Sequence, residues 1–242
     1  MSQARSVGGE TATALMFDRL PDAQARLVGW LYIGTIVCGL FAEVAVRSRV
    51  RADDAATTLL NIGRQQFLYR AGEAADLVML CCYIVITALL YRLFAPAARS
   101  LSLVAACFSM IGIAVLAVAG LLHLLPLTLL ESPTIAGASE FAQLALALHA
   151  KLYGLSVVFF GVYCLLIGWL AMSSRLMPRS VGLLMMMGGL THIITRFLWI
   201  LTPSTLAFIP SPINLLPLLG EAVFALWLVL FGLRRVSSPS PA

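Results

Sequence analysis

Residues 188–203, GGLTHIITRFLWILTP, and residues 214–227, NLLPLLGEAVFALW, decide how the rest of the chain is interpreted. Both stretches are apolar enough to lie in a lipid bilayer, yet between them they carry His192, Arg196 and Glu221. An ionisable side chain at the centre of a membrane helix costs roughly 2.5–3.5 kcal/mol on insertion scales. These three residues therefore mark either contacts between helices or a functional site inside a membrane domain.

The composition of the whole chain supports this interpretation. Of 242 residues, 61% are hydrophobic and 11% are charged, whereas about a quarter of the residues are charged in an average globular protein. Each backbone that spans a membrane must satisfy its own hydrogen bonds, and an α-helix does so within one segment. The sequence predicts an all-α, multi-pass bundle surrounded by lipids of the cytoplasmic membrane.

Six segments have the length that a bilayer crossing requires, which is roughly 20 residues. They cover residues 26–46, 73–94, 101–130, 140–172, 180–201 and 214–233. We expect a transmembrane domain over residues 26–235, with polar, disordered tails at 1–25 and 236–242. The first tail lacks the apolar core of a secretory signal, and Met16 is an alternative start to Met1.

The positive residues in the connections predict the orientation. With the N-terminus inside, the inner connections and termini hold Arg5, Arg19, Arg26, Arg92, Arg99, Arg175, Arg179, Arg234 and Arg235. The outer connections then hold Arg47, Arg49, Arg51, Arg64 and Arg70. This bias favours both termini inside, and it also accounts for the net charge of +5 without a nucleic-acid partner.

Most ionisable residues of the apolar segments gather towards the outer end of the predicted bundle. His123 and Lys151 belong to this end and lie near the interface. We predict a polar, outward-facing cavity whose ligand-binding residues are Glu43, Glu73, Asp76, His149, Tyr153, His192, Arg196 and Glu221.

Three functions remain open for this cavity. It can bind or pass a small molecule or a lipid. Alternatively, a membrane-embedded enzyme acts on a lipid or isoprenoid, by acid catalysis with Glu221, Asp76 or His192, or with a divalent metal. The metal ligands would be His149, His192 and Glu221, drawn from different helices because no local ligand pair is present. The third possibility is a structural or partner-binding subunit. In that case the acids Glu43, Asp76 and Glu221 pair with Arg70, Lys151 and Arg196.

Two smaller features complete the prediction. Gly154, Gly161 and Gly168 are spaced seven apart, a pattern that lets another helix or a second copy of the chain pack closely. The five cysteines lie in apolar segments and are expected to be free thiols. They are Cys38, Cys81, Cys82, Cys107 and Cys164.

Several phrases resemble a bacterial family of polytopic membrane proteins of unknown function, DUF4386. They are RLVGWLY (26–32), FAEVAVR (41–47), AGEAADLVML (71–80), LHAKLYGLSVVFFGVYCLLIGWL (148–170), TRF (195–197) and GE (220–221). The resemblance implies a shared fold and no established reaction, substrate or cofactor. It covers Glu43, Asp76, His149, Arg196 and Glu221, whereas the family tends to carry an acid near His192.

Overall fold

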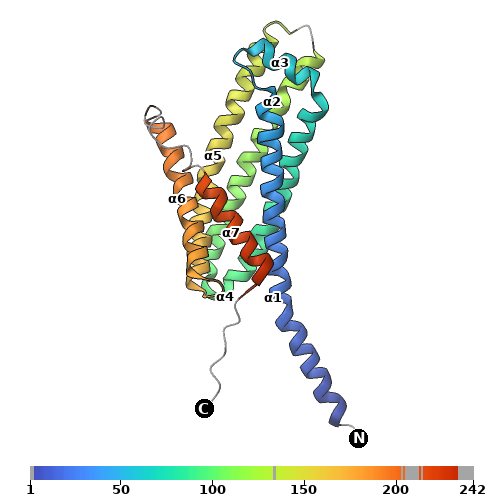
Figure 1. Ribbon diagram of the computed structural model, residues 1–242, viewed down its shortest axis with the longest axis vertical. Coiled ribbons are helices and arrows are strands. Elements are labelled where there is room, and N and C mark those ends of the chain that lie inside the picture. The colour runs from blue at the N-terminus through green and yellow to red at the C-terminus, as the bar shows by residue number, and fades with distance from the viewer. Residues whose placement is uncertain (1–2, 133–134, 203, 205–212, 214, 234–242) are drawn as a thin grey trace.

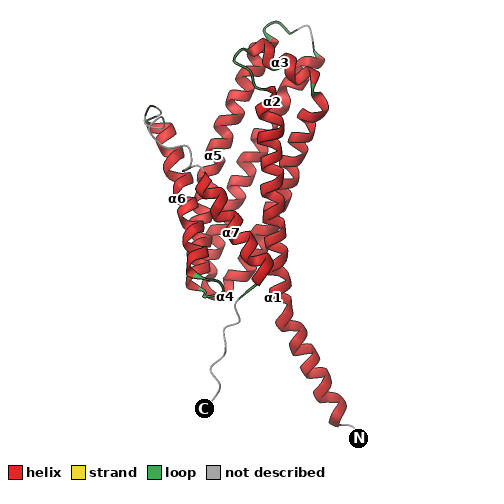
Figure 2. Cartoon of the chain, viewed as in Figure 1, coloured by secondary structure: helices red, strands yellow, loops and turns green. Residues whose placement is uncertain are grey.

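The computed structural model describes residues 3–132, 135–202, 204, 213 and 215–233, with side chains described from Asp22 onward. Its elements are α1 (Gln3–Leu40), the π-helix η1 (Phe41–Arg47), α2 (Ser48–Val50), α3 (Ala55–Arg64), α4 (Gln66–Glu131), α5 (Ala138–Ser173), α6 (Arg179–Leu201) and α7 (Leu216–Phe231). All regular structure among these residues is helical (Figure 2).

Helix α4 is two helices joined at a sharp bend. Ala98 has a non-helical backbone, with φ −158° and ψ 81°, two residues after Pro96. Hydrogen bonds join residues before the bend to residues after it. Thr87 bonds Ser109, and further from the bend the hydroxyl of Tyr69 donates to the carbonyl of His123. The two legs of α4 therefore run antiparallel, and the described helices make six passes along the bundle (Figure 1).

The distribution of apolar side chains is that of a membrane protein. Four helices, in the segments Asp22–Val50, Gln66–Glu131, Ala138–Ser173 and Arg179–Leu201, are long and apolar enough to cross a membrane, and α7 is a shorter apolar helix. The outer surface carries large apolar groups, among them Trp30, Leu121 and Phe231, each at least 61% exposed. Aromatic groups also fill the centre, where Tyr32, Phe94 and Phe224 are fully buried. The chain is a helical membrane bundle.

Both ends of the described chain emerge at one end of the bundle, and α3 lies across the other (Figure 1). Helix α3 begins where the side chain of Asp54 accepts a hydrogen bond from the amide of Thr57, an N-cap. It packs against α4 and α5 through the buried Thr58 and Ile62. We call this the α3 end of the bundle.

Helices α5 and α6 pack through glycines at seven-residue steps. A Cβ on Gly161 would stand 2.9 Å from the carbonyl oxygen of Gly189, and one on Gly168 would stand 2.5 Å from that of Gly182. Each step of seven along α5 is thus matched by a step of seven in the opposite direction along α6. The helix that packs closely on these glycines of α5 is therefore α6 of the same chain.

The N-terminal region contains the first part of α1. This helix begins at Gln3 and extends beyond the bundle (Figure 1). Polarity argues against burial but not against helix, and this stretch contains several alanines and other helix formers. Extension of a helix that is already formed needs no new nucleus. The predicted tail at 236–242 lies outside the described residues.

Candidate functional site

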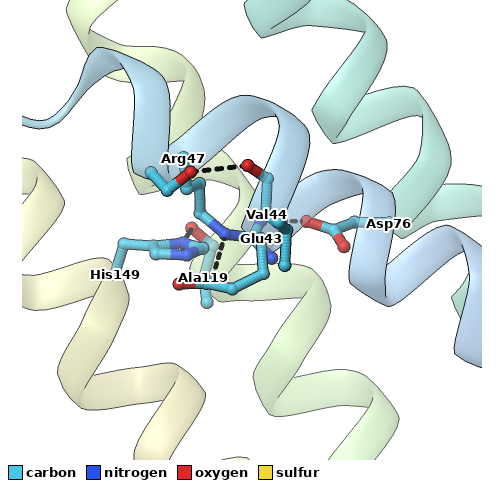
Figure 3. Close-up of polar contacts among 7 residues, drawn as sticks. Glu43, Val44, Arg47, Asp76, Ala119 and His149 are labelled. Carbon is cyan, nitrogen blue, oxygen red and sulfur yellow. Dashed lines mark hydrogen bonds and ion pairs between the residues drawn. The ribbon is translucent and has the colours of Figure 1, made fainter.

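Arg47 is the centre of a buried ion-pair group at the α3 end. Its Nε donates to Glu43 at 2.7 Å, and its Nη1 donates to Asp76 at 2.5 Å (Figure 3). The guanidinium also lies over the ring of Tyr153, 5.9 Å from the ring centre. Arg47 and Asp76 are only 5% and 7% exposed, whereas the side chain of Glu43 is 54% exposed. One cation thus links the first pass of the bundle to α4 and α5.

The π-helix η1 explains why Arg47 lies inside the bundle. The sequence predicted that the first helix ends near Val46 and that Arg47 opens a basic loop. Instead the chain continues as η1, whose wider turn keeps both Val46 and Arg47 buried. Short π-helical segments often occur at functional sites. The signal available in the sequence was the spacing of Glu43 and Arg47, four residues apart, which suits an ion pair on one helix.

Two histidines from different helices lie next to this group. Nδ1 of His149 is 3.0 Å from the carbonyl oxygen of Ala119 (Figure 3), and since a carbonyl only accepts, Nδ1 carries the proton. The centre of the His123 ring is 5.2 Å from that of His149 and 4.2 Å from that of Tyr69, on which it stacks. His123 is completely buried, and neither of its ring nitrogens has a hydrogen-bond partner.

A pocket of about 330 Å³ opens between these histidines and the α3 end. Its polar lining comes from Arg47, Arg51, Thr58, Tyr69, His123, Gln143 and His149, and its apolar lining from Val50, Ala52, Leu146, Ala147 and Ala150. His123 lies about 12 Å along α4 from its end at Glu131, at 1.5 Å per residue. The pocket therefore extends well below the α3 end of the bundle.

Two carboxylate oxygens near the pocket are also buried without a partner. Oδ1 of Asp76 is one, although the other oxygen of that carboxylate holds Arg47. Oε2 of Glu73 is the second, and its carboxylate packs directly against Gly120, where a Cβ would collide with it. Buried polar groups in proteins are nearly always hydrogen-bonded. These two oxygens and the ring nitrogens of His123 are thus buried polar atoms of this end of the bundle that have no hydrogen-bond partner.

Glu221 lies elsewhere, in the aromatic core. Its carboxylate is 3.4 Å from the hydroxyl of Tyr83 and 3.6 Å from the sulfur of Cys164, so it joins α7 to α4 and α5. The hydroxyls of Tyr32 and Tyr163 are 3.4 Å apart in the same core. The alternative in which Glu221 pairs with Arg196 is wrong, because the described ion pairs join Arg47 to Glu43 and Asp76, and Arg70 to Glu131.

His192 and Arg196 lie on α6 against the glycine face of α5. A Cβ on Gly161 would meet the Cβ of His192 at 3.1 Å, and one on Gly154 would meet Nη1 of Arg196 at 3.6 Å. The sequence placed these two residues and Glu221 in one cavity with Glu43, Asp76 and His149. The structure brings the last three together around Arg47, and it separates the others because they face different neighbouring helices.

The same separation bears on the metal hypothesis. The candidate ligands His149, His192 and Glu221 lie in three different environments, on α5, α6 and α7. Across the described residues, no group of three or more His, Cys, Asp and Glu side chains is placed to hold a metal ion. The five cysteines, all described, are free thiols.

Comparison with known proteins gives one match. Neither the curated proteins nor the solved structures contain a match to the chain. A family model described as "Domain of unknown function (DUF4386)" matches residues 27–232, which run from within α1 to just beyond the end of α7 and include all the residues of the candidate site. The chain is therefore a member of the DUF4386 family of proteins of unknown function.

Proposed function

We propose that the pocket at the α3 end binds a small molecule or the headgroup of a lipid. The observation that carries this proposal is His123, a fully buried imidazole in the pocket wall whose two ring nitrogens have no partner. A neutral imidazole has one hydrogen-bond donor and one acceptor. Burying both without a hydrogen-bond partner costs free energy. A ligand that reaches His123 would satisfy them.

The lining defines the chemical character of the ligand. Arg51 and Gln143 are exposed and contribute polar groups to the pocket, whereas Val50, Leu146 and Ala150 form apolar wall. A volume of about 330 Å³ lies at the small end of the range for ligand pockets. These features suit an amphipathic molecule with a polar head directed to His123 and His149.

The alternatives are less well supported by the same contacts. For an enzyme that uses a membrane-embedded acid, Glu221 is the leading candidate, but its oxygens contact Tyr83 and Cys164 inside the packed core. For a purely structural subunit, the polar cluster should be fully self-paired. Arg47 is paired, whereas His123 and one oxygen each of Glu73 and Asp76 are not. Binding is therefore the function we favour.

We also propose that the protein resides in the cytoplasmic membrane with both termini inside, so that the pocket opens outward. The support for this orientation is the excess of arginines at the end that carries the termini. With Arg47 buried inside the bundle, the bias towards that end is larger than the sequence suggested.

A steric variant tests the pocket. Ala147 lines it and is exposed, so Ala147→Trp fills the entrance with little disturbance of the core. Leu144→Trp on the same helix is the matched control, since Leu144 is 54% exposed and lies outside the lining. Native mass spectrometry of protein purified in mild detergent would count bound small molecules and lipids from a bacterial polar lipid extract.

We expect wild type and Leu144→Trp to carry the same bound species and Ala147→Trp to lose it. His123→Phe, which keeps a ring to stack on Tyr69, should weaken retention about tenfold, the value of one good hydrogen bond. A species that is retained equally by all four proteins, or no bound species in wild type, would show that the pocket has another role.

A further inference from the structure

His149 lies in the wall of the pocket with its tautomer fixed. Its Nδ1–H donates to the carbonyl oxygen of Ala119 at 3.0 Å (Figure 3). A neutral imidazole that carries its proton on Nδ1 can only accept at Nε2. No described residue donates to this Nε2, and the ring lines the pocket at the α3 end. A ligand that meets His149 must therefore bring a hydrogen-bond donor.

The other polar groups of the lining include both donors and acceptors. His123 has one N–H and one bare nitrogen, and neither has a partner. The side-chain amide of Gln143 also offers both kinds of group. Tyr69 donates its proton to the carbonyl of His123, so its oxygen is left as an acceptor. A headgroup that only accepts or only donates would leave part of this lining unpaired.

A negatively charged headgroup gains little from the two arginines of the lining. The guanidinium of Arg47 is already held by Glu43 at 2.7 Å and by Asp76 at 2.5 Å, and these two acids lie outside the lining. Arg51 is exposed, so water screens its charge and an ion pair there contributes little. A carboxylate or a fully ionised phosphate has no proton to donate to Nε2 of His149. An anion is therefore a poor match for this pocket.

A positively charged headgroup is disfavoured for the opposite reason. The described residues that line the pocket include two arginines and no aspartate or glutamate. An ammonium group would donate to Nε2 of His149, but it would share the pocket with the buried guanidinium of Arg47 and touch no carboxylate. A neutral headgroup avoids the costs of both kinds of charge.

We propose that the pocket at the α3 end takes a neutral headgroup with adjacent hydroxyls, such as the glycerol of a monoacylglycerol or a single sugar. A hydroxyl both donates and accepts, so it can donate to Nε2 of His149 while it accepts from His123. The apolar wall of Val50, Leu146 and Ala150 takes the start of the alkyl chain. This inference rests on the proposed binding function and names the chemistry of its ligand.

Probes that share one acyl chain or one headgroup distinguish these classes of ligand. They are a monoacylglycerol, the fatty acid with the same chain, the methyl ester of that acid, and free glycerol. Full-length protein is titrated with each probe in micelles of an amine-oxide detergent, which has no hydroxyl to compete for the pocket. Bound probe is counted by native mass spectrometry.

We expect wild type to bind the monoacylglycerol about tenfold more tightly than the methyl ester, which accepts but cannot donate. The ionised fatty acid should bind as weakly as the ester, because it also lacks a donor. Free glycerol that binds as tightly as the monoacylglycerol would assign the pocket to a free polyol. Weaker binding of free glycerol would assign it to a lipid.

Variants connect the preference to His149. His149→Phe keeps a ring but removes the acceptor, so the monoacylglycerol and the methyl ester should bind it alike. His149→Gln provides an acceptor again and should recover part of the preference. Leu144→Trp, on the same helix but outside the lining, is the control and should behave as wild type. The readout is the ratio of the two affinities within one variant, because a merely structural effect would weaken both probes together.

Two results would overturn the inference. One is a fatty acid or methyl ester that binds wild type as tightly as the monoacylglycerol, and this ranking decides alone if His149→Phe does not fold. The other is a preference for the monoacylglycerol that persists in folded His149→Phe. If Ala147→Trp still abolished binding of the probes in either case, the proposed binding function would stand with a ligand of another class or another contact.

Discussion

Arg47 holds two carboxylates of unequal exposure, so the residues of this group differ in their contribution to stability. Removal of Arg47, as in Arg47→Met, leaves the carboxylate of Asp76 buried without its cation. We expect a loss of about 3–5 kcal/mol in the free energy of unfolding, the usual cost of breaking a buried pair. Glu43→Gln should cost about 0–1 kcal/mol, because its side chain is largely exposed. Denaturant titration in mixed micelles measures both.

A double variant separates the pair from its surroundings. Arg47→Met combined with Asp76→Leu removes both charges, and replacement of a buried pair by apolar groups is often neutral. The double variant should therefore be more stable than Arg47→Met alone. If Arg47→Met and Glu43→Gln instead proved equally mild, the ion pair with Asp76 would not be a stabilising contact of the bundle.

Gly120 offers a second test at the scale of single residues, since the carboxylate of Glu73 occupies the space where a side chain would start. Gly120→Ala forces Glu73 to move within a packed interior, and we expect a loss of about 1–3 kcal/mol. Gly34→Ala is the control, because a Cβ there meets nothing within 4 Å. It should be neutral or stabilising by roughly 0.5–1 kcal/mol, the helix preference for alanine over glycine. The melting temperatures of the two variants in detergent give the comparison.

A substitution of Glu73 tests whether its carboxylate causes the loss of stability in Gly120→Ala. In a Glu73→Ala background the obstacle is gone, so Gly120→Ala should then behave like Gly34→Ala. A loss that persists in this background would mean that Gly120 is required for another reason, such as the backbone approach of a neighbouring helix.

At the scale of helices, Asp54 predicts a pH response of the element that covers the pocket. The amide and hydroxyl of Thr57 bond its carboxylate, which lowers the pKa of Asp54 below its ordinary value of 3.8. A lowered pKa means that the capping contribution is complete above the unfolded value and is lost as the pH falls through the folded value. We expect the amides of α3 to lose protection from hydrogen exchange only below about pH 4.

Two variants at the same position provide the controls. Asp54→Asn keeps a good N-cap without a titrating group, so protection of α3 should no longer depend on this acid transition. Asp54→Ala removes the cap and should reduce protection at every pH. A wild-type transition that survives unchanged in Asp54→Asn would assign it to a different group.

Most helices could be located from the sequence, because hydropathy and helix-breaking residues are local signals. The expected segments 140–172 and 180–201 agree with α5 and α6 to within two residues at each end. The first helix was cut short at Val46 because Arg47 looked like loop sequence, although it is covered by the bundle.

The sequence predicted how far along its helix each site residue lies, but not which neighbouring helix its side chain faces. Counting residues along each helix placed Glu43, Asp76 and His149 near one end, and the structure brings them together around Arg47. The same counting placed Glu221 with Arg196, but they face different neighbours, because helix order and rotation depend on packing such as the Gly161–Gly189 contact. His123 was judged an ordinary interface residue, since only the fold shows that its ring is enclosed.

At the scale of the whole molecule, six passes place both ends of the described chain on one side of the bundle and α3 on the other. We expect Arg64→Cys, at the exposed end of α3, to react with a membrane-impermeant maleimide in intact cells. Arg175→Cys, in the exposed turn before α6, should react only after the cells are made permeable. The five native cysteines are replaced beforehand. Reversed labelling would invert the orientation, and labelling of both positions from one side would contradict the number of passes.

The π-helix η1 fixes the register of the residues that follow it in the first pass of the bundle. Returning residues 41–47 to α-helical geometry would rotate whatever follows by about 100°, the angle of one residue at 3.6 residues per turn. Arg47 would then swing away from Asp76 and towards the lipid, and the chain leading into α2 and α3 would turn with it. A shift of η1 by one residue would thus break the contact between the first pass and α4 and would move α3, which lines the pocket through Thr58, in the same step.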